Sequence, residues 1–131
     1  MGLHDKKICF VGAGNMANAI IGGLVQNGFS AANIIASSPS EEHLQQIKTK
    51  WGVQTSSDNA SSVKQAEIIV LSVKPQVLKL VCEELSVNLS HRPLIISIAA
   101  GIELKSLNAW LGKDQALVRC EQQVSGQIVD K

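Results

Sequence analysis

Residues 8–17 read ICFVGAGNMA, a short apolar stretch that runs directly into the pattern Gly-x-Gly-x-x-Ala. Such a junction between a strand and a helix is the shape that a backbone needs to hold a dinucleotide pyrophosphate. Gly12 permits the tight turn, Gly14 lets the backbone approach the phosphates, and Ala17 lets the new helix pack closely on the sheet. Unpaired N–H groups at the helix start then face the anion. The stretch therefore predicts a dinucleotide-binding turn.

The sequence around this turn has the order of elements that the interpretation needs. Residues 7–11 predict a buried strand of a parallel sheet. The next segment predicts a helix that ends at Asn27-Gly28 and is followed by a strand over residues 33–36. The expected apolar stripe of that helix consists of Met16, Ala19, Ile20, Gly23 and Leu24. The alternative, a glycine-bearing turn that binds nothing, is the weaker one because the flanking elements fit.

The rest of the chain continues to alternate between strands and helices. We expect helices over residues 41–50, 77–89 and 104–111, and a further short helix that follows Asn59 and ends near Gln65. We expect strands over residues 68–71, 94–98 and 115–120, and a further short strand that begins at Val53. The expected inward-facing residues of the helices over 41–50 and 77–89 are Leu44, Ile47, Val77, Leu80, Val81, Glu84 and Leu85.

Short connections between alternating strands and helices predict the α/β class, with a doubly wound parallel sheet of the Rossmann type. We expect residues 1–120 to form one NAD(P)-binding domain. Residues 121–131 are polar and weakly periodic, so they are expected to be a tail without assigned structure and not a second domain.

Composition excludes several classes of protein. The 131 residues are 45% hydrophobic, enough for the core of one domain, and the net charge of +1 is spread without a long charged block. We therefore expect no nucleic-acid partner and no polybasic membrane patch. The longest apolar stretch, residues 94–102, is too short to span a bilayer. Cys9, Cys82 and Cys120 are odd in number and widely spaced, which indicates a reducing cytoplasm, and no metal-ligand spacing occurs.

The end of the second expected strand indicates which dinucleotide is bound. An NAD site usually has Asp or Glu there to bind the ribose 2′-hydroxyl. Here the sequence is Ala36-Ser37-Ser38-Pro39, with two hydroxyls that can donate to a 2′-phosphate and no carboxylate. This favours NADP, with NADPH preferred and NADH the second candidate, although no Arg lies nearby to strengthen the preference. The alternative is that Ser37 and Ser38 only cap the next helix.

Five blocks of the sequence, spread in order between residue 7 and Cys120, resemble pyrroline-5-carboxylate reductase: VGAGNMA (11–17), ASSP (36–39), DN (58–59), VKPQ (73–76) and ISIAAGI (96–102). The first block alone is a generic fingerprint, and the last two together are more specific. The resemblance implies reduction of the small molecule 1-pyrroline-5-carboxylate to L-proline with NADPH or NADH, the last step of proline biosynthesis.

The resemblance also implies a set of cofactor-binding residues, each of which lies at the end of an expected strand or after it. They are Val11, Gly12, Ala13, Gly14, Asn15, Met16, Ser38, Asn59, Ser72, Val73, Lys74, Pro75, Ile98, Ala99 and Ala100. We add Ser37 because its hydroxyl, like that of Ser38, can donate to a 2′-phosphate. Residues 11–16 would hold the pyrophosphate, Ser38 and Asn59 the adenosine side, and residues 98–100 the nicotinamide end. Asn59 has an alternative role as a helix cap, and Lys74 as a solvated charge. No catalytic side chain is assigned, because a protonated imine needs mainly a well-placed hydride donor.

The C-terminus departs from the resemblance. The family follows this region with a Met-x-Asn-Thr-Pro-like segment and a helical domain that forms the homo-oligomer and completes the substrate pocket, whereas here Val118-Arg119-Cys120 continues as EQQVSG. The expectation is therefore a cofactor domain that binds NADPH with weak or absent turnover. Another NADP-dependent oxidoreductase or imine reductase, and a non-catalytic dinucleotide-binding module, remain as alternatives.

Overall fold

The computed structural model describes residues 5–99, 101–112, 115–122 and 128–130. Its strands form one seven-stranded sheet in the order β3-β2-β1-β4-β5-β6-β7. The first six strands are parallel, and β7 runs antiparallel to β6. The strands are β1 (Ile8–Val11), β2 (Ile34–Ser37), β3 (Gln54–Ser56), β4 (Ile68–Leu71), β5 (Leu94–Ser97), β6 (Ala116–Gln122) and β7 (Ile128–Asp130). The doubly wound sheet predicted from the sequence is confirmed.

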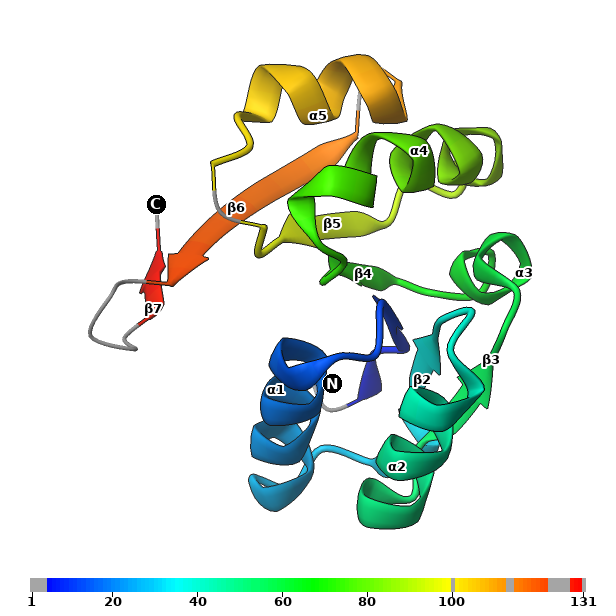
Figure 1. Cartoon of the computed structure of the whole chain (residues 1–131). Coiled ribbons are helices and arrows are strands. Elements are labelled where there is room, and N and C mark those ends of the chain that lie inside the picture. Colours follow the sequence, from blue (N-terminus) through cyan, green and yellow to red (C-terminus); the bar gives the residue numbers. More distant parts are fainter. Residues whose placement is uncertain (1–4, 100, 113–114, 123–127, 131) are drawn as a thin grey trace.

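Helices cover both faces of this sheet, with α1 and α2 on one face and α3, α4 and α5 on the other (Figure 1). The helices are α1 (Asn15–Gln26), α2 (Glu41–Trp51), α3 (Asn59–Val63), α4 (Pro75–Leu85) and α5 (Leu104–Leu111), with short 3₁₀ turns η2 (Ala31–Asn33) and η3 (Ser86–Asn88). Because successive side chains of a strand point to opposite faces, β1 supplies both cores. Its Phe10 packs under α1 and α2, and its Cys9 and Val11 pack under the other three helices.

Two of the expected apolar stripes are wrong. In α1 the buried residues are Ala17, Ile21 and Gly22, and the expected Ala19 is exposed. Gly22 is buried because the ring of Trp51 from α2 lies over it, leaving no room for a side chain. The stripe is therefore rotated by about one residue from the predicted one.

In α4 the buried residues are Leu78, Cys82 and Leu85, whereas Val77 and Leu80 are 44% and 71% exposed. Leu78, Cys82 and Leu85 have helical spacing as good as that of the predicted set. The helix also begins at Pro75, two residues earlier than expected, and ends at Leu85 instead of Leu89. Cys82 behaves as a small apolar residue and packs in the core between α4 and the sheet.

The C-terminal region has more regular structure than the sequence predicts. Strand β6 continues to Gln122, and residues 128–130 pair with it as β7. The two strands pair through backbone hydrogen bonds, which form whether the side chains are polar or apolar. Ala100, one of the expected site residues, lies outside the described residues.

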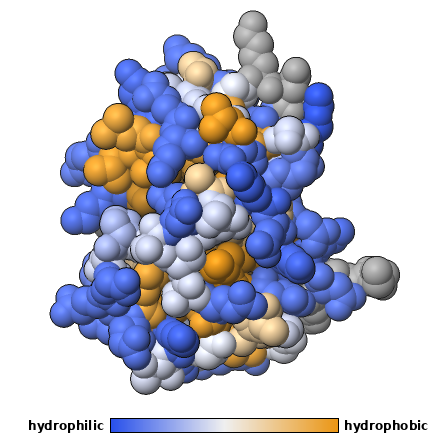
Figure 2. All heavy atoms as spheres, turned by 90° about the vertical axis from the view of Figure 1, so that its right-hand side faces the viewer, coloured by the Kyte–Doolittle hydropathy of each residue, from blue (hydrophilic) through white to orange (hydrophobic). Residues whose placement is uncertain are grey.

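The surface carries separate apolar areas among hydrophilic ones (Figure 2). Large apolar side chains that are exposed include Val77, Leu80, Val87, Leu104 and Val118. Among the residues that the structure describes, no helix has both the length and the apolar composition needed to cross a bilayer.

Candidate functional site

Four strands end side by side at the carboxyl edge of the sheet, and backbone hydrogen bonds hold their exits together. Gly12 N donates to Ser37 O at 2.7 Å, which joins the ends of β1 and β2. Ser72 N donates to Val11 O at 2.9 Å, and Ile98 N donates to Leu71 O at 3.2 Å. The chain proceeds from β1 toward β3 on one side and from β4 toward β6 on the other, so the strand order reverses between β1 and β4. Open α/β sheets bind ligands at such a switch point.

Gly12 is required for the geometry of this edge. Its φ of +110° lies in the region that favours glycine, and a Cβ there would come within 2.9 Å of the Ser72 carbonyl carbon and oxygen. The Ser72 hydroxyl in turn donates to Val11 O at 3.0 Å and to Gly12 O at 3.3 Å. The turn after β1 therefore packs directly against the backbone that leaves β4.

Gly14 has the opposite surroundings. A Cβ there would meet no protein atom within 4 Å, and its backbone is extended. Gly14 is the N-cap of α1, but no side chain of the described residues caps this helix and no acidic residue lies in its first turn. The first N–H groups of a helix have no partner within the helix, and they carry its positive end. The start of α1 therefore combines free donors with open space above them.

On the adenosine side of the expected site, three side chains are linked by hydrogen bonds. The hydroxyl of Ser37, which is fully buried, donates to Asn59 Oδ1 at 2.5 Å. The other end of the same amide donates to Glu84 Oε1 of α4 at 3.3 Å. The cap of α3 is Asp58, whose Oδ1 accepts from Ser61 N at 3.3 Å, so the capping alternative for Asn59 is wrong. Because the single O–H of Ser37 donates to Asn59 Oδ1, it is not available to donate to a ligand, and Ser37 is linked to the edge through Asn59.

Ser38 and the start of α2 lie beside this chain. The N-cap of α2 is Ser40, whose hydroxyl accepts from His43 N at 3.3 Å, so neither Ser37 nor Ser38 caps this helix. Ser38 Oγ accepts from Ser40 N at 3.1 Å, which fastens the turn between strand and helix. No acceptor for the O–H of Ser38 lies among the described residues. This hydroxyl therefore keeps a donor for a ligand.

The exits of β4 and β5 complete the edge. Lys74 is the exposed N-cap residue of α4 and Pro75 is its first residue, while Val73 packs on the core. Ile98 is half-buried and Ala99 is buried, and the small Ala99 side chain leaves the exit of β5 unobstructed. The described members of the predicted set are thus gathered at one edge.

The remaining polar and reactive groups lie elsewhere. Burial raises the pKa of both the Cys9 and Cys82 thiols to about 12, so neither is a nucleophile at neutral pH. A hollow of about 350 Å³ lies under α3, lined mainly by residues at the amino ends of β1, β2 and β3, away from the carboxyl edge. The described residues hold no group of three or more His, Cys, Asp and Glu side chains placed to bind a metal ion.

The residues present fit a dinucleotide. Free donors at the start of α1 suit a pyrophosphate, and the space above Gly14 is where a ligand backbone would pass. Sequence reasoning missed one residue of this edge, Glu84, which lies 25 residues from Asn59 along the chain. Nothing in the local pattern around Glu84 signals that contact.

Comparison with known proteins agrees with a dinucleotide site at this edge of the sheet. Residues 7–101 match the family model described as NADP oxidoreductase, coenzyme F420-dependent. The chain belongs to this family. A pyrroline-5-carboxylate reductase from Pseudomonas aeruginosa is 47% identical over 118 residues, which are 90% of this chain and 43% of that protein. One from Vibrio alginolyticus is 42% identical over 126 residues, 96% of this chain and 46% of the relative. The chain thus spans less than half the length of these curated relatives, and the resemblance seen in the sequence is confirmed.

Solved structures agree with the sequence relatives. A pyrroline-5-carboxylate reductase from Coxiella burnetii has a TM-score of 0.85 at 40% identity, covering 88% of this chain and 43% of its own. A pyrroline carboxylate reductase from Plasmodium falciparum, solved with NADP bound, has a TM-score of 0.80 at 25% identity and covers 92% of this chain and 43% of its own. A prephenate dehydrogenase from Aquifex aeolicus, at 18% identity, shares the fold alone.

Proposed function

We propose that this chain is the cofactor-binding part of a pyrroline-5-carboxylate reductase, which reduces 1-pyrroline-5-carboxylate to L-proline with NADPH preferred over NADH. The observation that carries the proposal is the uncapped start of α1 at the switch point, with open space above Gly14. The identity of 47% to a named reductase supplies the substrate class.

The residues of the chain have separate roles in this proposal. The N–H groups of Asn15 and Met16 bind the pyrophosphate, because they are the first donors of α1. Ser38 donates to the 2′-phosphate, and Asn59 contacts the adenosine ribose. Val73 to Pro75 and the exit of β5 line the path toward the nicotinamide. The nicotinamide, when bound, supplies the hydride.

No side chain of this chain is assigned to proton transfer. A protonated imine is already an electrophile, so positioning of the hydride donor accounts for much of the acceleration. The relatives are more than twice as long as this chain, and we propose that the rest of their length supplies the substrate pocket and the homo-oligomer. Turnover by these 131 residues alone is therefore expected to be weak or absent. We also propose a reducing, cytoplasmic setting, supported by the unpaired Cys9 and Cys82.

The test is a titration of the intrinsic fluorescence of Trp51 and Trp110 with NADPH and with NADH, because reduced nicotinamide absorbs where tryptophan emits. We expect both to bind, NADPH more tightly. A steady-state assay with 1-pyrroline-5-carboxylate then separates binding from turnover. Absence of binding by either nucleotide overturns the proposal, and rapid turnover overturns its expectation for this chain alone.

A further inference from the structure

The chain Ser37–Asn59–Glu84 contains a carboxylate where the sequence of β2 has none. In NAD sites an acidic residue at the tip of the second strand lies beside the ribose 2′-hydroxyl. Here Ser37 stands at that tip, and Asn59 connects it to the Glu84 carboxylate through hydrogen bonds of 2.5 Å and 3.3 Å. A segment far along the chain therefore brings one negative charge close to the adenosine side of the edge.

Glu84 also decides how the Asn59 amide lies. A hydroxyl can either donate or accept, so Ser37 alone is compatible with both orientations of the amide. An ionised carboxylate only accepts, and it therefore requires the N–H₂ end of Asn59. The amide oxygen is then turned to Ser37, which becomes the donor. The contact with Glu84 thus sets the donor and acceptor pattern of all three residues.

We infer that Glu84 is a positioning residue that determines nucleotide preference: it orients Asn59 for the adenosine ribose, and its charge disfavours a 2′-phosphate. The inference rests on the proposed function and refines it. Ser38 favours NADPH through its free O–H, and Glu84 opposes that preference through like charge. The preference for NADPH is consequently smaller than Ser37 and Ser38 imply.

The size of the effect of Glu84 on nucleotide affinity follows from the Coulomb interaction between its charge and the 2′-phosphate in water. Glu84 is exposed, so water and salt reduce its field. At low ionic strength, removing one charge roughly 10 Å from a phosphate changes affinity by about three-fold. Reversing the charge changes it by about ten-fold, because the repulsion becomes an attraction of similar size.

The experiment compares Glu84→Gln and Glu84→Lys with the wild-type chain, using NADPH and NADH as the probes in the fluorescence titration at low and at high salt. We expect the affinity ratio of NADPH to NADH to rise about three-fold in the first variant and about ten-fold in the second. Both increases should shrink at high salt, where the Debye length falls to about 3 Å. Glu83→Gln and Glu83→Lys are the matched controls, because Glu83 is exposed on the same helix and lies outside the Ser37–Asn59–Glu84 chain.

Each outcome has a separate meaning. If the wild-type chain binds neither nucleotide, the proposed function fails. If it binds both and the ratio is unchanged in the Glu84 variants, or changes as much in the Glu83 variants, the role of Glu84 is wrong and the proposed function stands. A simple structural role would weaken both nucleotides equally and leave the ratio constant. A ratio that rises with the charge change at Glu84 only, and less at high salt, supports the inference.

Discussion

Helices α1 and α2 both begin at the carboxyl edge of the sheet and pack on the same face, yet their starts are built differently. Helix α2 has a side-chain cap, with Ser40 accepting from His43 N, and Glu41 and Glu42 lie in its first turn. Helix α1 begins at Gly14 without a side-chain cap or an acidic residue. The donors of α2 are partly satisfied and its acids repel anions. Of these two helix starts, that of α1 is therefore the one suited to hold a phosphate.

The largest expected effect comes from breaking the turn that leads into α1. Gly12→Ala places a Cβ within 2.9 Å of the Ser72 backbone at a φ of +110°. Since backbone atoms cannot move aside as a side chain does, we expect a loss of roughly 2–4 kcal/mol in the free energy of unfolding. Urea denaturation measures it. Gly28→Ala is the control, because its φ of +96° is also positive but its Cβ would meet nothing within 4 Å. Equal losses in the two variants would show that the contact with Ser72 does not matter.

The second prediction exchanges the properties of the two helix starts. In Gly14→Asp the new carboxylate caps the free N–H groups of α1 and repels a pyrophosphate, so NADH affinity should fall by about 100-fold or more. The free energy of unfolding should stay within about 0.5 kcal/mol, because Gly14 has open space around it. In Ser40→Ala the cap of α2 is lost, at a cost of about 1 kcal/mol, and NADH affinity should change less than two-fold.

Fluorescence titration and urea denaturation of the two variants measure both quantities. Tight NADH binding by Gly14→Asp would place the nucleotide elsewhere. Loss of NADH binding in a well-folded Ser40→Ala protein would mean that α2 also takes part.

Much of this edge could be predicted from the sequence because its determinants are local. The apolar strand, Gly12, Gly14 and the helix after them lie within a few residues of one another, and the parallel order of strands follows from the alternation of elements. The buried face of α4 was not predictable in the same way. Both Val77 with Leu80 and Leu78 with Cys82 have helical spacing, and only contact with the sheet selects the second pair.

Contacts between segments that are distant in the sequence could not be predicted from local patterns either. Asp58 and Asn59 are adjacent residues that both suit a cap, and the fold assigns the cap to the first and gives the second to Ser37. Glu84 approaches Asn59 only because α4 crosses the sheet beside α3. The residues at the end of β2 include no carboxylate, although in the folded chain Glu84 lies close to them through Asn59.

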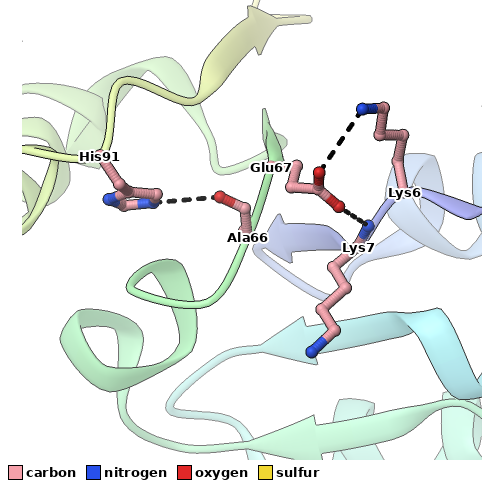
Figure 3. A network of polar contacts seen from close by, with 5 residues as sticks. All are labelled: Lys6, Lys7, Ala66, Glu67 and His91. Atoms are coloured by element: carbon pink, nitrogen blue, oxygen red, sulfur yellow. Dashed lines mark hydrogen bonds and ion pairs between the residues drawn. The ribbon is translucent and has the colours of Figure 1, made fainter.

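The smallest expected effect concerns the opposite, amino edge of the sheet, which is closed by its own side chains (Figure 3). Glu67 accepts from the backbone N–H of Lys7 at 3.0 Å and pairs with Lys6 Nζ at 3.5 Å. The hydrogen bond from Lys7, followed by the charges of Lys6 and Lys7, lowers the pKa of Glu67 below its ordinary value of 4.5. A lowered pKa means that the folded state favours the ionised form. This stabilisation is present above the ordinary pKa and disappears as pH falls through the folded-state pKa.

The third prediction is therefore a difference in urea stability between the wild-type chain and Glu67→Gln that is measurable at neutral pH and vanishes at acid pH. Glu103→Gln is the control, because its pair with Lys105 spans 3.9 Å between side chains that are 68% and 81% exposed, and such pairs contribute little. A difference for Glu67→Gln that persists below the folded-state pKa would show that the hydrogen bond from Lys7 does not depend on the charge. The neutral Glu67 side chain would then also help to hold the amino edge, beside the bonds that Glu67 N and Ile68 N donate to Lys7 O.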